Sequence, residues 1–125
     1  MYAAQLETYR NMQKATLSGR ELEAEILTKA AQKLKYCQDH WDAANREEML
    51  DEALKYNQKI WTLFQSELAK PENPLPKKLK EDLLSLSAFV DKKIFDTMSF
   101  PAPEKLSAII NINMNISAGL RGARA

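Results

Sequence analysis

The sequence predicts an all-α single domain, a bundle of four or five helices with a proline-rich interhelical connection. The three glycines and five prolines divide the chain into long stretches that contain neither residue. These stretches are rich in Leu, Ala, Lys, Glu and Gln, which favour helix, and hold a single valine. Apolar residues recur within them at helical spacing. The length of 125 residues fits one domain, which we take as residues 1–125.

The first half of the chain predicts three helices. Residues 2–16 form a weakly patterned one. Ser18 and Glu21 then make a capping-box pattern before the second helix. Its apolar stripe is Leu22, Ile26, Leu27, Ala30, Ala31, Leu34, Cys37 and Trp41. After a break near residues 42–46, Asn45 and Glu48 repeat the cap pattern, and the third helix carries Met49, Ala53, Leu54, Ile60, Trp61, Phe64 and Leu68.

The segment KPENPLPKK is the clearest boundary in the chain. Proline restricts both itself and the residue before it, so no helix continues through this segment. A fourth helix follows, with an apolar stripe of Leu79, Leu83, Leu86, Phe89, Val90, Ile94 and Met98. The segment SFPAPEK ends that helix, and Pro103 and Glu104 suit the first turn of the next one.

The last segment alternates asparagines with apolar residues, which is the pattern of a half-buried strand over residues 109–116. Helical spacing nevertheless explains a longer stretch, residues 103–119, and a lone strand has no partner in a helical chain. We therefore predict a helix, with Gly119 and Gly122 near its C-cap and a short tail at 120–125. Asn111 and Asn115 fall on its polar side, whereas Asn113 falls within its apolar face.

Composition and charge exclude several function classes. The formal net charge of +1 gives no overall attraction to nucleic acid or to an anionic membrane. We expect no signal peptide and no membrane-spanning segment, because no apolar run is long enough. Cys37 and His40 are the only cysteine and histidine. A structural zinc site usually needs four such ligands, so we expect no metal, no cofactor and no catalytic site, and take Cys37 as a core residue.

Two asparagines at apolar helix positions leave two interpretations open. Asn57 and Asn113 are either hydrogen-bonded core amides that fix helix register, or they line a groove that accepts another helix. In the second case the candidate partner-binding residues are Tyr56, Asn57, Trp61, Phe64, Ile109, Asn113 and Ile116.

A group of lysines supports one alternative partner. Lys77, Lys78, Lys80, Lys92 and Lys93 make the fourth helix locally basic and suit contacts with RNA phosphates. Asp82, Glu81 and Asp91 are interspersed among them, which favours an ordinary solvated face.

Several segments together resemble the FlaF family of bacterial flagellar regulators. They are YAAQ at 2–5, RELEAEILTKAAQKL at 20–34, LDEALKYNQKIWTLF at 50–64, NPLPKKLK at 73–80 and PEKLSAIININMNISAGLRG at 103–122. They follow one another in order over well over half of the chain, and YNQKIW and NINMNISAGLRG are the most specific.

The resemblance implies a small cytoplasmic helical protein needed for flagellin production. It implies action beside a second regulator, FlbT, in control of flagellin synthesis after transcription, and binding of flagellin itself as a secretion chaperone. Flagellin's terminal segments are helical and are unfolded before export, so a helix-in-groove mode suits such a client. The alternative is a regulator that binds flagellin mRNA directly.

Overall fold

A computed structural model describes residues 19–122 as four α-helices and one short 3₁₀ helix. The elements are α2 (Gly19–Asp39), α3 (Arg46–Ala69), α4 (Lys77–Ser99), η1 (Pro103–Lys105) and α5 (Leu106–Gly122). No strand occurs within residues 19–122, so the predicted all-α class is confirmed. The stretch 109–116 lies inside α5, which confirms the helical interpretation. The expected helix 2–16 and the Ser18 cap lie outside the described residues.

The helix boundaries follow the glycine and proline pattern with three differences. Asn45 is the N-cap of α3 as expected, but its side chain makes no capping hydrogen bond. The last helix begins with a 3₁₀ turn at Pro103 before it becomes α-helical at Leu106. It also continues through Gly119 to Gly122, and no described glycine has a positive φ. Glycine lacks a side chain but retains its backbone N–H, so α5 passes Gly119 at only a modest cost in stability. The tail expected from residue 120 therefore starts no earlier than 123.

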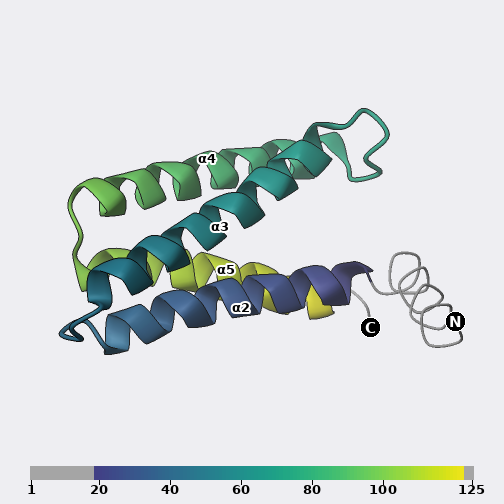
Figure 1. Cartoon of the computed structure of the whole chain (residues 1–125). Coiled ribbons are helices and arrows are strands. Elements are labelled where there is room, and N and C mark those ends of the chain that lie inside the picture. Colours follow the sequence, from purple (N-terminus) through teal and green to yellow (C-terminus); the bar gives the residue numbers. More distant parts are fainter. Residues whose placement is uncertain (1–18, 123–125) are drawn as a thin grey trace, which may run out of the picture.

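The centre of the bundle is the antiparallel pair α2 and α5, with α3 crossing it (Figure 1). Ala24, Ala30 and Ala31 on α2 are buried, and such small side chains let two helix axes approach closely. The approach is close enough for Ser117 Oγ on α5 to donate a 2.8 Å hydrogen bond to the Ala24 carbonyl on α2. Leu27, Leu34, Leu54, Trp61, Ile94, Leu106 and Ile109 complete the main core.

Helix α4 lies on the side of α3 away from α2 and contacts α5 only lightly (Figure 1). Val90 and Ile94 are fully buried as predicted, but Leu79 and Phe89 are exposed. The predicted apolar stripe of α4 was too wide. Helix α4 packs chiefly against α3, and a single neighbouring helix covers only a narrow face. Ser87 and Thr97 occupy buried positions there.

Each of these two hydroxyls is satisfied within α4. Ser87 Oγ donates to the Leu84 carbonyl at 2.8 Å, and Thr97 Oγ1 donates to the Lys93 carbonyl at 2.7 Å. Leu22 on α2 is a further wrong prediction, since 43% of it is exposed.

Candidate functional site

Two buried asparagines join three helices through one hydrogen-bond network. Asn113 Nδ2 on α5 donates to Asn57 Oδ1 on α3 at 2.6 Å. Asn57 Nδ2 donates to the carbonyls of Ala53 at 2.8 Å and Ala30 at 3.1 Å, the latter on α2. Trp61 Nε1 completes the network by donating to Asn113 Oδ1 at 2.9 Å. Every polar atom of the two amides therefore has a partner, which removes most of the cost of burying them.

The network decides where the predicted partner-binding residues lie. Asn57, Ile109 and Asn113 are fully buried in the core, so their side chains do not reach a partner surface. For these three the groove prediction is corrected: the amides bond to each other and to the indole, and Ile109 packs within the apolar core. Asn111 and Asn115 on the same helix are exposed, as their helical angles predicted.

Of the other four predicted residues, Tyr56, Phe64 and Ile116 are partly exposed, whereas Trp61 is buried and only borders the groove. Trp61, Phe64 and Ile116 line one apolar groove, while Tyr56 lies on a different face beside Lys33, whose ammonium sits 5.0 Å from the ring centroid. The Trp61 and Phe64 rings meet edge to face at a centroid distance of 5.8 Å. This arrangement is favourable for aromatic pairs and fixes both rings in the groove wall.

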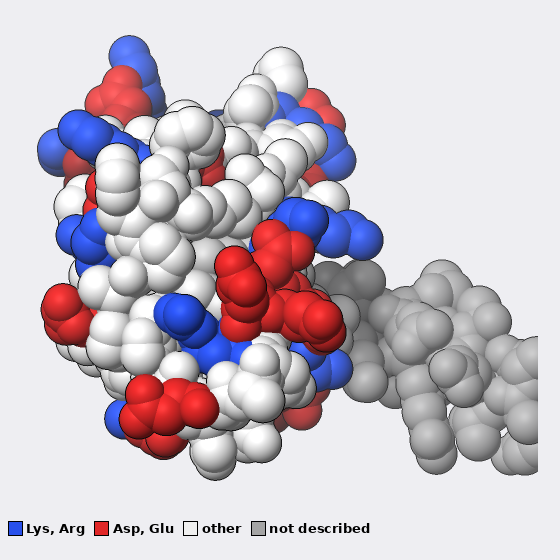
Figure 2. Space-filling view, turned by 60° about the vertical axis from the view of Figure 1, so that its left-hand side comes forward, with Lys and Arg blue, Asp and Glu red and all other residues white. Residues whose placement is uncertain are grey.

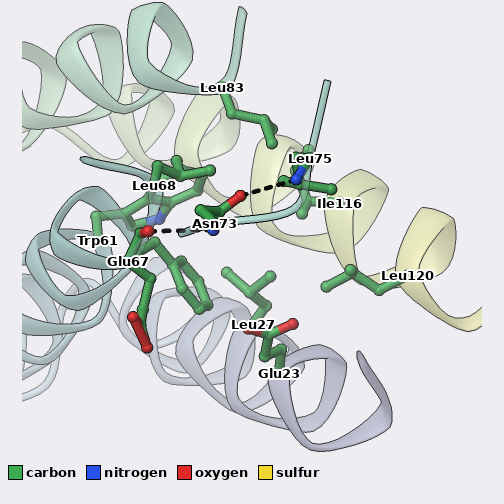
Figure 3. A pocket seen from close by; sticks show the side chains of 11 residues that line it. Glu23, Leu27, Trp61, Glu67, Leu68, Asn73, Leu75, Leu83, Ile116 and Leu120 are labelled. Atoms are coloured by element: carbon green, nitrogen blue, oxygen red, sulfur yellow. Dashed lines mark hydrogen bonds between the residues drawn. The ribbon is translucent and has the colours of Figure 1, made fainter. Parts of the chain in front are cut away.

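The ribbons of α3 and α4 diverge from those of α2 and α5 toward one end of the bundle (Figure 1). The groove lies between them, and Figure 3 shows the side chains that line it. Its apolar wall consists of Leu27, Trp61, Phe64, Leu68, Leu75, Leu83, Ile116 and Leu120. These residues come from all four helices and from the 70–76 connection. The groove has a volume of about 130 Å³, which is smaller than an ordinary small-molecule pocket and leaves room for a few apolar side chains. A concave apolar surface of this kind suits an apolar side-chain stripe.

The proline-rich connection contributes one wall of the groove in a fixed conformation. Asn73 Nδ2 donates to the Glu67 carbonyl at 3.1 Å, and Asn73 Oδ1 accepts from the Leu75 backbone N–H at 3.1 Å (Figure 3). Asparagine side chains commonly stabilise turns by such bonds to nearby backbone. The turn directs Leu75 against the groove beside Leu83 of α4.

Two carboxylates also line the groove, and they differ in their surroundings. Glu67 on α3 forms an ion pair with Lys70, with 2.7 Å between Oε2 and Nζ. Glu23 on α2 is half-buried next to the apolar wall. Burial raises the pKa of the Glu23 carboxyl, and the negative charge of Glu67 raises it further, while Arg20 acts in the opposite direction.

Cys37 and His40, the two side chains considered as metal ligands, lie apart from the groove. Cys37 is buried in the core, whereas His40 is exposed, stacks on Tyr36 and lies 2.8 Å from the Tyr36 carbonyl through Nδ1. Within residues 19–122, no three potential metal-ligating side chains cluster together. No described helix is long and apolar enough to cross a membrane.

Charged side chains of both signs are interspersed on the face shown in Figure 2, with acidic groups near the centre and a broad uncharged area above them. This face therefore carries no continuous basic surface. Among the lysines proposed for RNA contact, Lys78 forms an exposed ion pair with Asp82 at 3.0 Å.

The comparison with protein families decides the affiliation. The model of the family described as "Flagellar protein FlaF" matches residues 5–120. The chain belongs to the FlaF family. This confirms the resemblance inferred from the separate sequence segments and makes the chain a flagellar-associated protein. Comparisons with curated proteins and with solved structures gave no match.

Sequence reasoning missed several groove residues in this FlaF-family chain. Leu75 was assigned only to a connection, and Glu23 was not among the candidate residues. A sequence signal existed for Glu23, because it lies four residues before Leu27 and hence on the same side of α2. No signal indicated that α3 and α4 would diverge from α2 there.

Proposed function

We propose that this FlaF-family protein binds flagellin in the cytoplasm as a secretion chaperone. In this proposal it promotes regulated flagellin synthesis and export together with an FlbT-type regulator. The observation that carries the proposal is the apolar groove bounded by Trp61, Phe64, Leu68, Leu83, Ile116 and Leu120. Flagellin's helical terminal segments present apolar stripes before assembly, and an amphipathic helix binds by placing such a stripe in an apolar groove.

The groove suits a client that must later be released. Its wall combines rigid aromatic side chains, held by the Asn57–Asn113–Trp61 network, with leucines on the 70–76 connection and on α4. Aromatic residues in such settings often supply much of the binding free energy. A client that becomes ordered on binding loses conformational entropy, which lowers its net affinity and favours release.

A matched pair of α4 leucines tests the proposal. Leu83 is half-buried and lines the groove, whereas Leu79, one turn earlier, is exposed and lies outside it. We expect Leu83→Glu to weaken binding of purified flagellin by about tenfold or more, because it places a charge in an apolar contact. Leu79→Glu should stay within about twofold of the unchanged protein, as expected outside an interface.

Binding is measured by titration calorimetry on the full chain, after thermal melts have shown that both variants fold. Equal effects of the two variants would contradict binding through the groove. Absence of flagellin binding by the unchanged protein would contradict the proposed client.

The alternative function is direct binding of flagellin mRNA, and the cluster of Lys77, Lys78, Lys80, Lys92 and Lys93 favours it. Binding of this kind weakens steeply as salt rises, because phosphate contacts release counterions. A titration of the flagellin transcript leader at two salt concentrations therefore separates this alternative from the groove proposal.

A further inference from the structure

Glu23 is an unusual group for the wall of an apolar groove. It is half-buried beside Leu27, and within residues 19–122 no cation lies within ion-pair distance of its carboxylate. The second carboxylate of the groove already has a cation, since Glu67 pairs with Lys70 at 2.7 Å. Among the described residues, Glu67 therefore has a cation beside it in the groove and Glu23 has none within ion-pair distance.

The position of Glu23 is unfavourable in the free protein. Burial and the charge of Glu67 both raise its pKa, which means that both oppose its ionised form. The attraction of Arg20, one turn earlier on α2, offsets this only in part, because the pKa remains above its ordinary value. A glutamine would keep the same shape without this cost, and a cation that entered the groove would offset it.

We propose that the groove binds an amphipathic helix whose apolar stripe is flanked by a lysine or arginine, and that Glu23 pairs with this cation. That the client is flagellin rests on the proposed function. The inference adds that the bound segment of the client carries a positive charge.

The geometry of the wall supports this pairing. Leu27 lies one turn after Glu23 on α2, and Ile116 and Leu120 lie across from them on α5 (Figure 3). A bound helix that places apolar residues against these three side chains brings a residue one turn away close to Glu23. Lysine and arginine suit that place because their aliphatic stems cover apolar surface while the charged end reaches a carboxylate.

Partial burial also makes the pair selective. An ion pair shielded from water is attracted more strongly than one on an open surface, and salt screens it less. A client with an acidic residue at the same place would meet repulsion from Glu23 and Glu67 together. Such repulsion discriminates against wrong partners as effectively as a new attraction favours the right one.

Three synthetic peptides test the proposal on the full-length protein. Each is a helix of about 18 residues with leucines at i, i+3, i+4 and i+7 spacing, and they differ only in one flanking residue, which is lysine, glutamine or glutamate. The protein variants are Glu23→Gln and the control Glu25→Gln, an exposed carboxylate on the same helix outside the groove. Binding is followed by titration calorimetry and by tryptophan fluorescence, measured on a Trp41→Phe background so that the signal comes from Trp61 in the groove wall.

We expect the lysine peptide to bind the unchanged protein and Glu25→Gln roughly tenfold more tightly than the glutamate peptide. In Glu23→Gln this preference should fall to about twofold or less, with the affinity for the glutamine peptide retained. Equal affinities of the three peptides for the unchanged protein, an unaltered preference in Glu23→Gln, or no peptide binding at all would each overturn the inference.

A parallel titration with purified flagellin separates this inference from the proposed function. If the lysine preference depends on Glu23 but flagellin does not bind, the client is wrong and the groove chemistry stands. If flagellin binds through Leu83 but Glu23→Gln leaves its affinity unchanged, the proposed function stands and the role of Glu23 is overturned. Self-association of the unchanged protein that disappears in Glu23→Gln would identify a second copy as the occupant and would also overturn the inference.

Discussion

Trp61 Nε1 donates a 2.9 Å hydrogen bond to Oδ1 of Asn113, which ties the wall of the groove to the polar centre of the bundle. Trp61 is 2% exposed, and the position of its indole ring depends on an amide of another helix. Asn113 in turn is held by Asn57, whose own amide bonds to α2. The shape of the groove is therefore coupled to the register of α2, α3 and α5.

Replacing Asn113 with leucine should destabilise the protein. The change removes the partner of Trp61 Nε1 and of Asn57 Oδ1, and a buried polar group left without a partner costs about 1–3 kcal/mol. Chemical denaturation of Asn113→Leu measures this loss. Asn111→Leu, two residues away on the exposed side of α5, should change the free energy of unfolding by less than about 0.5 kcal/mol. An Asn113→Leu variant as stable as the unchanged protein would show that the network contributes little.

Much of this network was accessible from sequence, and its assembly was not. Helical angles placed Asn113 on the apolar face of its helix and Asn57 on the apolar face of another. Asn57 and Asn113 meet each other and the indole of Trp61 only at one position of α3 along the axis of α5. A single sequence does not specify that position, because ridges and grooves of two helices fit together in more than one register.

The groove was less predictable than the core for a related reason. Leu27 and Leu68 were recognised as apolar helix positions, but a stripe looks the same whether a neighbouring helix covers it or leaves it open. Here α4 packs chiefly on α3 and leaves the α2–α5 pair uncovered near Leu83. The helix spacings alone do not determine which pair of helices diverges.

A second polar contact holds α2 against α5, and removing it should cost less. Ser117 Oγ donates to the Ala24 carbonyl at 2.8 Å and lies 2.7 Å from Thr28 Oγ1. Ser117→Ala should lower the free energy of unfolding by about 1 kcal/mol, since alanine fits the small space but loses these bonds. Ser107 on α5 is exposed, and its hydroxyl accepts a solvent-exposed 2.9 Å hydrogen bond from Gln38 Nε2, so Ser107→Ala is the matched control and should cost clearly less than Ser117→Ala. Equal melting temperatures for the two variants would contradict a special role for Ser117.

The lysines of α4 should be dispensable for flagellin binding. Replacing Lys77, Lys78 and Lys80 with glutamine removes two exposed charges and a partly exposed one, and charges in contact with water contribute little at physiological salt. We expect the triple variant to retain flagellin affinity within about twofold, because the apolar groove carries the proposed contact. The test measures flagellin and transcript-leader binding on the same sample. Loss of transcript binding, accompanied by loss of flagellin control in cells, would favour the RNA alternative.

The raised pKa of Glu23 predicts a specific dependence of stability on pH. Between the ordinary carboxyl pKa of 4.5 and the higher folded-state value, the folded protein holds a proton that the unfolded chain has released. The contribution of Glu23 to stability is therefore most favourable below pH 4.5 and is lost as pH rises through the folded-state pKa. Glu23→Gln removes this loss, so the variant should be more stable than the unchanged protein at pH 7, and the difference should vanish toward pH 4.

Denaturant unfolding of Glu23→Gln, Glu25→Gln and the unchanged protein at a series of pH values measures this difference. Subtracting the free energy of unfolding of the unchanged protein at each pH cancels the contributions of the other carboxylates, which both proteins share. Glu25→Gln should follow the unchanged protein throughout, because its exposed carboxylate lies outside the groove. If Glu23→Gln is instead destabilised at pH 7, the ionised carboxylate stabilises the free protein and has no need of a cation from a client. A gain in stability combined with loss of the lysine preference would show that Glu23 is kept for binding at the expense of stability.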